Sequence, residues 1–249
     1  MEDWRYIDLG FVNLPMLHAI EEAIAKSPGL NTFMLWIASP PTVSIGYFHS
    51  VEEEVNIQAC KVLGVEISRR ACGGGVAYFD EKELYYSVII KKMPSFIPQS
   101  IHGSFEAVCK GLIYALEEFG LKAIFLGKND VLVNGKKISG NAQTRRWNTM
   151  IIHGTFLVDF DFETATRVLK TSLEKFRDKG VFSVYNRVTT LKNELKRDVL
   201  IKDVKAALER GFAKALNANF IRDELTNEEI RLAQEFRKKY ASLEWIFKR

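Results

Sequence analysis

The chain has 249 residues, of which 47% are hydrophobic and 27% are charged, and its formal net charge is +4. This composition is typical of a globular protein with a sizeable core, and it excludes a low-complexity or disordered chain. A small net charge that mixes both signs does not predict a nucleic-acid surface. The sequence contains no run of about 18 apolar residues, so no membrane span is predicted. We therefore expect neither nucleic acid nor a membrane as a partner.

The three cysteines, Cys60, Cys72 and Cys109, are widely spaced and include no CxxC pair. An odd, scattered set predicts neither a disulfide framework nor a zinc site, so it favours a reducing compartment. The first ten residues lack the basic start and apolar stretch of a signal peptide. We expect a cytoplasmic protein, with Cys109 as a core residue on a helix.

The first predicted elements are a helix and a group of short strands. Apolar residues at helical spacing predict a helix over 15–26. Apolar or alternating runs then predict strands at 33–38, 42–47, 65–70, 76–80 and 84–90. Pro40-Pro41 predicts a turn between the first two strands.

The middle of the chain holds the clearest helix and a second group of strands. Apolar residues recur every three or four positions over 101–119, and Gly120 is a good stop signal. The run DVLVNGKKISG (130–140) contains Asn134-Gly135, a strong signal for a two-residue hairpin turn. A long strand is expected over 149–160, with Gly154 as a candidate for a bend.

The last third is predicted to be helical, with helices near 162–170, 199–216 and 226–240. Thr226 and Glu229 form a capping-box pattern at the start of the last helix. Hairpins outnumber strand–helix–strand units, which favours an α+β fold with a largely antiparallel or mixed sheet flanked by helices. We expect one domain over residues 1–249, with its helical third at about 162–249.

The stretch RRACGGGVAYFD (69–80) carries the first chemical signal. Three glycines allow backbone N–H groups to approach an anion closely, and Arg69 and Arg70 offer positive charge. The spacing matches neither a P-loop nor a dinucleotide fingerprint. On spacing alone, a flexible connection between two strands is an equal alternative.

The stretch GKNDVLVNGKKISGNAQTRR (127–146) carries the second signal. Side chains alternate across a strand, so Lys136 and Lys137 point to opposite faces and one of them faces inward. A buried ammonium needs an anionic partner, and a phosphate or a carboxylate would serve. The alternative is an edge strand that leaves both lysines in water.

Together these stretches resemble the signatures of the lipoate–protein ligase A family, within the biotin/lipoyl ligase-like group. The first is similar to RRxxGGGxVxHD, and the second to GxNDxxVxGxKISGxAQ. Further similar segments are IGYFHSVEEEVN (45–56), HGTFLVD (153–159), NRVTTLKNEL (186–195) and the tail LTNEEIRLAQEFRKKYASLEW. The resemblance covers nearly the whole chain and implies the biotin/lipoyl protein ligase-like catalytic fold.

The resemblance implies that ATP, with Mg²⁺, activates lipoate to lipoyl-AMP. The lipoyl group then passes to a lysine of a lipoyl-carrier domain of the 2-oxoacid dehydrogenase or glycine-cleavage type. Such a reaction depends on positioning and on stabilising charge at phosphate and carbonyl oxygens. ATP and lipoate would be substrates, and no tightly bound cofactor is expected.

The resemblance also assigns roles to residues. Lys137 would be catalytic, contacting both the adenylate phosphate and the lipoyl carbonyl. Asp130 would hold part of the nucleotide or a magnesium ion, or would support the fold. The nucleotide would be held by Arg70, Gly73, Gly74, Gly75, Val76, Ala77, Tyr78, Asp130 and Lys137. Lipoate would lie against Gly74, Lys137 and His153, with an ordinary interior histidine as the alternative for His153.

The sequence also departs from the family's pattern. Phe79 replaces a histidine of the first signature, Tyr85 or a neighbour replaces an asparagine, and His49 replaces a glutamine. These changes affect the acyl pocket more than the glycine stretch. Because the family's C-terminal accessory domain is not recognised after the EW of the tail, we expect adenylation to need a separate accessory subunit.

Three alternatives remain open. The nearest is an octanoyl or lipoyl transferase of the same fold, which uses a cysteine nucleophile and an acyl-carrier donor without ATP. In those transferases the cysteine lies near the KISG or HG segments, whereas here only Cys72 lies near the site. A biotin–protein ligase would show a GRGRxGR-like loop, which is absent. A non-catalytic lipoate-binding module would not need Arg70, the three glycines and Lys137 together.

Overall fold

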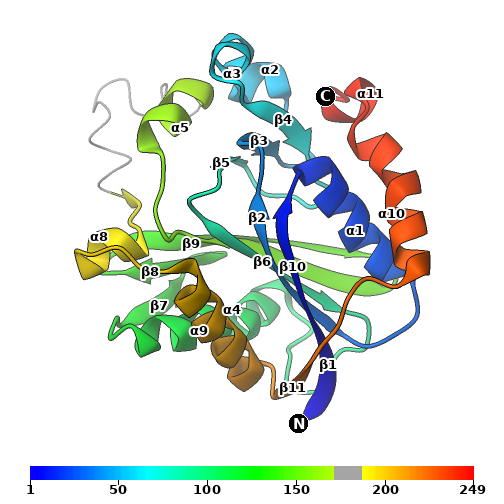
Figure 1. Ribbon diagram of the computed structural model, residues 1–249, viewed down its shortest axis with the longest axis vertical. Coiled ribbons are helices and arrows are strands. Elements are labelled where there is room, and N and C mark those ends of the chain that lie inside the picture. Colours follow the sequence, from blue (N-terminus) through cyan, green and yellow to red (C-terminus); the bar gives the residue numbers. More distant parts are fainter. Residues whose placement is uncertain (171–186) are drawn as a thin grey trace.

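The computed structural model describes residues 1–170 and 187–249, so Asn186 of the segment 186–195 lies outside the described residues. An eight-stranded sheet forms its centre, in the order β11-β1-β2-β6-β10-β9-β8-β7 (Figure 1). β1 pairs in parallel with β11 and β2, and the other neighbours are antiparallel. The strands are β1 (Glu2–Val12), β2 (Thr32–Ala38), β6 (Leu84–Ile90), β7 (Ala123–Leu126), β8 (Asp130–Val133), β9 (Lys136–Arg146), β10 (Thr149–Phe156) and β11 (Ala218–Arg222).

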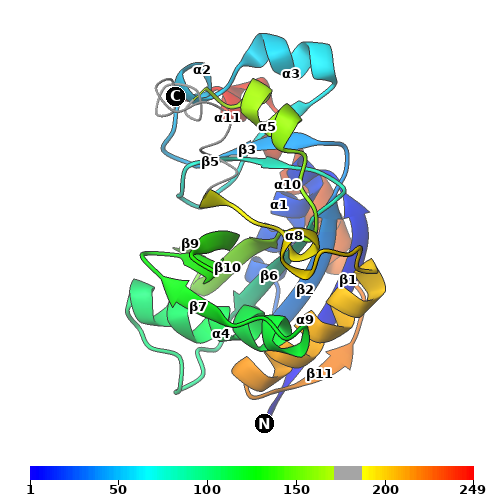
Figure 2. The same cartoon turned by 90° about the vertical axis from the view of Figure 1, so that its left-hand side faces the viewer.

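Two helix pairs cover this sheet on opposite faces. α4 (Ile101–Glu118) and α9 (Ile201–Ala215) lie on one face, and α1 (Leu14–Lys26) and α10 (Asn227–Tyr240) lie on the other (Figures 1 and 2). Alternation along β6 explains both contacts, because Tyr86 and Val88 join the core of the first pair while Ile89 joins that of the second. The predicted α+β fold with a mixed sheet is therefore confirmed.

A second, three-stranded sheet lies above the large one, in the order β4-β3-β5 (Figure 2). Its strands are β3 (Thr42–Ile45), β4 (Glu66–Arg69) and β5 (Val76–Phe79), and the helices around it are α2 (Val51–Glu54), α3 (Ile57–Leu63), α5 (Phe162–Val168) and α11 (Leu243–Ile246). Its own apolar core includes Val43, Ile45 and Tyr78. A short helix, α8 (Leu191–Leu195), follows the undescribed segment.

Most predicted elements are present. Asn134 and Gly135 adopt φ values of 50° and 76°, as a two-residue hairpin turn with both central residues left-handed requires. Thr226 and Glu229 form the predicted capping box of α10. β1, β7, β11 and the short helices α2, α3, α8 and α11 are not among the predicted elements.

The predicted strand over 149–160 is wrong in its last four residues and in its bend. β10 ends at Phe156, where its partner β6 begins with Leu84, so no strand remains to pair with beyond that point. Gly154 keeps an unbroken register with both neighbouring strands. A Cβ at Gly154 would lie 2.0 Å from Oδ1 of Asn141, so this glycine provides space for a side chain, not a bend.

Within the two described ranges, no helix is both long and apolar enough to cross a membrane.

Candidate active site

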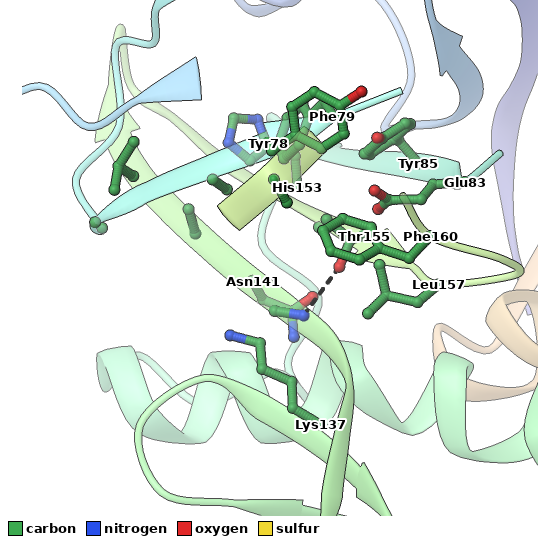
Figure 3. Close-up of a pocket in the computed structure, with 18 of the residues that line it drawn as sticks. Tyr78, Phe79, Glu83, Tyr85, Lys137, Asn141, His153, Thr155, Leu157 and Phe160 are labelled. Carbon is green, nitrogen blue, oxygen red and sulfur yellow. Dashed lines mark hydrogen bonds between the residues drawn. The ribbon is translucent and has the colours of Figure 1, made fainter. Parts of the chain in front are cut away.

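A cavity of roughly 280 Å³ lies between the two sheets. Residues of β5, β9 and β10 line it, and Figure 3 shows their side chains converging on one space. Its polar side includes Arg70, Asn129, Lys137, Asn141 and His153. Its apolar walls include Trp36, Phe79, Tyr85, Leu157, Phe160 and Val188. A largely apolar pocket with a few polar groups suits a small ligand with an apolar chain and a polar head.

A thiol, an imidazole and a carboxylate form a continuous chain beside this cavity. Cys72 Sγ lies 2.9 Å from His153 Nε2, and His153 Nδ1 lies 2.9 Å from Glu21 Oε1. The three side chains come from the β4–β5 loop, β10 and α1. His153 lines the main cavity and also a smaller one that includes Cys72 and Glu21. This order of groups is that of an activated cysteine nucleophile, its base and the residue that orients the base.

The electrostatics agree with that order. Burial alone would raise the pKa of Cys72, but the adjacent His153 and then Arg70 outweigh it and lower that pKa. Burial alone would lower the pKa of His153, but Cys72 and Glu21 raise it to about 10. The pKa of Glu21 is lowered, since the two histidines outweigh its burial. Cys72 and His153 are therefore stabilised as a thiolate–imidazolium pair.

The two arginines before the glycine loop hold different parts of the chain, and Arg70 is the one that holds the loop. Arg70 donates hydrogen bonds to the carbonyl oxygens of Gly73, Gly75 and Ser44, and its side chain is almost fully buried. Arg69 is fully buried and donates to carbonyls that include Gly46, His49 and Ile246. The Arg70 guanidinium therefore shapes the glycine loop, whereas that of Arg69 joins the segment after β3 to α11.

Gly74 and Gly46 allow this loop to close. Gly74 has a φ of +92°, and a Cβ there would lie 2.8 Å from the Arg70 guanidinium. A Cβ at Gly46 would lie 1.8 Å from the Gly74 carbonyl oxygen. Gly73 and Gly75 have open space at their Cβ positions, so their backbone is accessible to a ligand. The nucleotide-binding role of Arg70, Gly73, Gly74, Gly75, Val76, Ala77 and Tyr78 stays a prediction.

Lys137 enters the cavity from β9, as the strand alternation predicts (Figure 3). Its Nζ forms an ion pair of 2.7 Å with Asp130 Oδ1, and the lysine side chain remains 38% exposed. Gly140 leaves room for the Lys137 ammonium, because a Cβ at Gly140 would lie 2.5 Å from the Lys137 Nζ. The structure thus brings Lys137 and Asp130 together, with the ammonium still partly exposed to the cavity.

Asn141 is a site residue that the sequence reasoning did not single out, although it follows the ISG of the second signature. Tyr86 donates to its Oδ1 at 2.5 Å, and its Nδ2 donates to the Asn129 carbonyl at 2.8 Å. Glu21 was also missed, because only the packing of α1 against β10 brings it to His153. The available signal was the pair His18 and Glu21, which lie three residues apart and so share one face of a largely apolar helix.

The described residues contain no group of three or more histidine, cysteine or acidic side chains arranged to hold a metal ion. Asp130, for which the nucleotide, a magnesium ion or a role in the fold was expected, is paired with Lys137. The role of Asp130 in holding the nucleotide or a magnesium ion stays a prediction.

The fold and this cavity define a class of enzymes that handle lipoyl and related acyl groups. Residues 10–213 match the family described as the lipoyl protein ligase A/B catalytic domain. The chain therefore belongs to this family, and the predicted resemblance is confirmed.

Individual relatives align with the whole chain. The octanoyltransferase LipM of Anoxybacillus flavithermus is 31% identical over 278 residues, covering 100% of this chain and 99% of the relative. The chain is also similar to a solved structure of a bi-partite lipoate protein ligase from Thermoplasma acidophilum, described with its E2 lipoyl domain, at 33% identity and a TM-score of 0.88, covering 99% and 97% of the two chains. A lipoate-protein ligase A bound with ATP gives 30% identity and a TM-score of 0.84, covering 99% of each chain.

These relatives correct the predicted reaction. The expected ATP-dependent activation of lipoate is wrong, since curated relatives that span the whole chain are octanoyltransferases. The prediction failed because transferases and ligases both resemble this chain over nearly its whole length. A largely apolar cavity with a polar side does not by itself reveal whether an acyl group would arrive as a free acid or as a thioester.

Proposed function

We propose that this protein transfers an octanoyl or lipoyl group from an acyl-carrier donor to a lysine of a lipoyl domain, through a thioester on Cys72. The observation that carries the proposal is the chain Cys72–His153–Glu21, with its two contacts of 2.9 Å. The chain has no cysteine after Cys109, so Cys72 is the nucleophile that this site offers.

The first step would load Cys72. Its thiolate attacks the carbonyl carbon of the donor thioester, a new C–S bond forms, and the bond to the carrier sulfur breaks. The carrier leaves as a thiol after taking the proton from the His153 imidazolium. Glu21 holds the imidazole in place during this transfer, in the role of the carboxylate in a triad.

The second step would unload Cys72 onto the acceptor. The neutral amine of the lipoyl-domain lysine attacks the thioester, a C–N bond forms, and Cys72 leaves as a thiolate. The amine proton passes to His153, which restores the starting pair. Lys137 would stabilise the developing negative charge on the carbonyl oxygen in both steps, because its ammonium lies in the cavity and is still partly exposed.

The partners follow from this reaction. A lipoyl domain as acceptor agrees with the Thermoplasma acidophilum ligase, which is described together with such a domain. The accessory subunit was expected for adenylation, and transfer from a thioester donor involves no adenylation. ATP and Mg²⁺ would likewise not be needed.

The test compares donors and variants. Purified protein is mixed with a lipoyl domain and either octanoyl-carrier protein or free octanoate with ATP and Mg²⁺, and modification is followed by mass spectrometry. We expect modification from the carrier donor alone, and a covalent acyl adduct on Cys72 when the acceptor is omitted. Cys72→Ser should abolish both signals, whereas Cys60→Ala, which changes a buried thiol outside the site, should retain them.

Modification that requires ATP and survives Cys72→Ser would overturn the proposal, since neither result is compatible with a thioester on this residue.

A further inference from the structure

Three positive side chains gather around two aromatic rings at the surface beside the glycine loop. Lys248 Nζ lies 3.5 Å from the centre of the Tyr47 ring, and Arg146 Cζ lies 4.6 Å from it. Arg249 Cζ lies 5.4 Å from the centre of the Phe48 ring, and Phe48 is 66% exposed. Figures 1 and 2 show the end of the chain beside α2, the helix that follows these rings. We call Tyr47, Phe48, Arg146, Lys248 and Arg249 the Tyr47 surface.

The positive charge of the Tyr47 surface is not balanced by carboxylates. None of its three cations forms an ion pair with an acidic side chain of the described residues. In the neighbouring α2, Glu54 pairs instead with His49 at 3.0 Å. Contacts with Lys248 and then with Arg146 lower the pKa of the Tyr47 hydroxyl, as a positive field there requires. Such a field beside an exposed aromatic ring suits an acidic protein partner.

This surface is joined directly to the loop that carries the proposed nucleophile. The Tyr47 N–H donates a hydrogen bond to the Cys72 carbonyl oxygen at 2.9 Å. Arg146 is the last residue of β9, and its neighbours Thr144 and Trp147 line the small cavity together with Cys72. A protein bound to the Tyr47 surface would therefore lie immediately beside the reacting sulfur.

The two protein partners of the proposed reaction differ in reach. The acceptor lysine has a four-carbon stem, so its terminal nitrogen lies only about 6 Å from its own backbone. The acceptor domain must therefore contact the enzyme right beside the thioester. An acyl-carrier donor presents its acyl group on a long flexible arm, so its own surface does not need to reach this loop. The position of the Tyr47 surface thus favours the acceptor.

We propose that the Tyr47 surface docks the acceptor lipoyl domain, with its cations facing acidic side chains beside the lysine that is modified. Phe48 would supply an apolar contact, and Arg146 and Lys248 would supply the charge complementarity that selects the partner. This inference rests on the proposed function only in taking a lipoyl domain as the acceptor.

The test measures docking with no acyl donor present. An unmodified lipoyl domain that the wild-type protein acylates is titrated calorimetrically, at two salt concentrations, into the wild type, Arg146→Ala/Lys248→Ala and Phe48→Ser. Arg146→Lys/Lys248→Arg keeps both charges. The matched control is Lys110→Ala/Lys122→Ala, which removes two exposed lysines of α4 and the start of β7, at the far end of the molecule from the C-terminus (Figure 2).

We expect the double alanine variant to bind the lipoyl domain about tenfold more weakly than the wild type, and with a smaller dependence on salt. Phe48→Ser should also weaken binding, and because this ring is exposed its replacement should not affect folding. The charge-preserving variant and the lysine control should bind within about twofold of the wild type. In the transfer assay, the KM for the lipoyl domain should rise in the double alanine variant, whereas the KM for the donor should not.

Equal affinities of the wild type, the double alanine variant and Phe48→Ser would overturn the inference. It would also be overturned if the lysine control weakened binding as much, since net charge alone would then explain the loss, or if only the KM for the donor rose. Transfer that survives Cys72→Ser would remove the proposed function but would leave these affinities unchanged.

Discussion

The three cysteines differ because of what lies within a few ångströms of each sulfur. Burial raises the pKa of Cys60 to about 11 and that of Cys109 to about 12, so both are unreactive core residues. Cys72 is just as buried, but its pKa is lowered by His153 and Arg70. Only the neighbours in the fold distinguish the three, which is why sequence spacing alone did not favour Cys72.

The first prediction concerns the charge of Cys72. The folded pKa of its thiol is lowered, so its contribution to stability is present above the unfolded pKa and is lost as the pH falls through the folded value. The pKa of His153 is raised to about 10, so its contribution is present below the unfolded pKa and is lost as the pH rises through about 10. Ultraviolet absorbance of the thiolate should therefore appear at a lower pH than that of an ordinary cysteine.

Two variants control this titration. His153→Gln should shift the appearance of the thiolate to higher pH, and Cys72→Ser should remove the signal. A wild-type thiolate that appears only in the range of an ordinary cysteine would contradict the predicted ion pair.

The second prediction concerns Lys137. Its ammonium lies in the cavity, whereas Lys136 is the neighbouring residue of the same strand and does not line it. Lys137→Ala should lower kcat by about 10²-fold with a smaller change in KM, because the lost interaction would act mainly on the developing oxyanion. Lys136→Ala should keep kcat within about twofold, and an equal loss in both variants would point to a change in surface charge.

At the scale of elements, the packing of α4 against α9 depends on two glycines. A Cβ at Gly211 would lie 2.3 Å from the Gly111 carbonyl oxygen, so the helix backbones touch where they cross. Gly→Ala in an open helix position usually stabilises by about 0.5–1 kcal/mol. The sign of the effect at Gly211 therefore reports whether the close contact exists.

The third prediction is that Gly211→Ala destabilises the fold by about 1–3 kcal/mol, because the added methyl group separates the two helices. Chemical denaturation measures the free energy of unfolding. Lys202→Ala, a change at an exposed position in the first turn of the same helix, should alter it by less than about 0.5 kcal/mol. A stabilised Gly211→Ala variant would show that the helices cross at a greater distance.

The elements that the sequence predicted best are those with strong local patterns. The apolar stripe over 101–119 predicted α4, and Asn134-Gly135 predicted the β8–β9 hairpin. The capping box of Thr226 and Glu229 predicted the start of α10. β1 and β11 pair in parallel across more than two hundred residues, and no local pattern encodes such a contact. In the same way, the motif stretches predicted Lys137 and the glycine loop as site candidates, whereas Glu21 comes beside His153 only through packing.

At the scale of the whole molecule, one buried cluster joins the first strand to the last long helix. Arg5 of β1 donates to Glu229 of α10 at 2.7 Å, and it also pairs with Asp223 at 2.9 Å. Glu229 accepts in addition from the Thr226 N–H at 2.8 Å, so one carboxylate caps the helix and fixes it against the sheet.

The fourth prediction is that Glu229→Ala destabilises the protein by about 3–5 kcal/mol, because it leaves the Arg5 charge buried and only partly paired. Glu228→Ala removes an exposed partner of Arg231 and should cost less than about 1 kcal/mol. Urea denaturation of both variants provides the comparison, and similar losses would show that the Arg5 pair contributes no more than a surface contact.

The contact between Cys72 and His153 also joins the two sheets, because the loop that carries Cys72 connects strands of the small sheet and His153 belongs to the large one. The thiolate is therefore an intrinsic spectroscopic reporter of how the sheets dock. If the small sheet separates before the large one unfolds, thiolate absorbance will disappear at a lower denaturant concentration than the helical circular dichroism signal. The same sulfur that would carry the acyl group can thus reveal whether this protein unfolds in one step or in two.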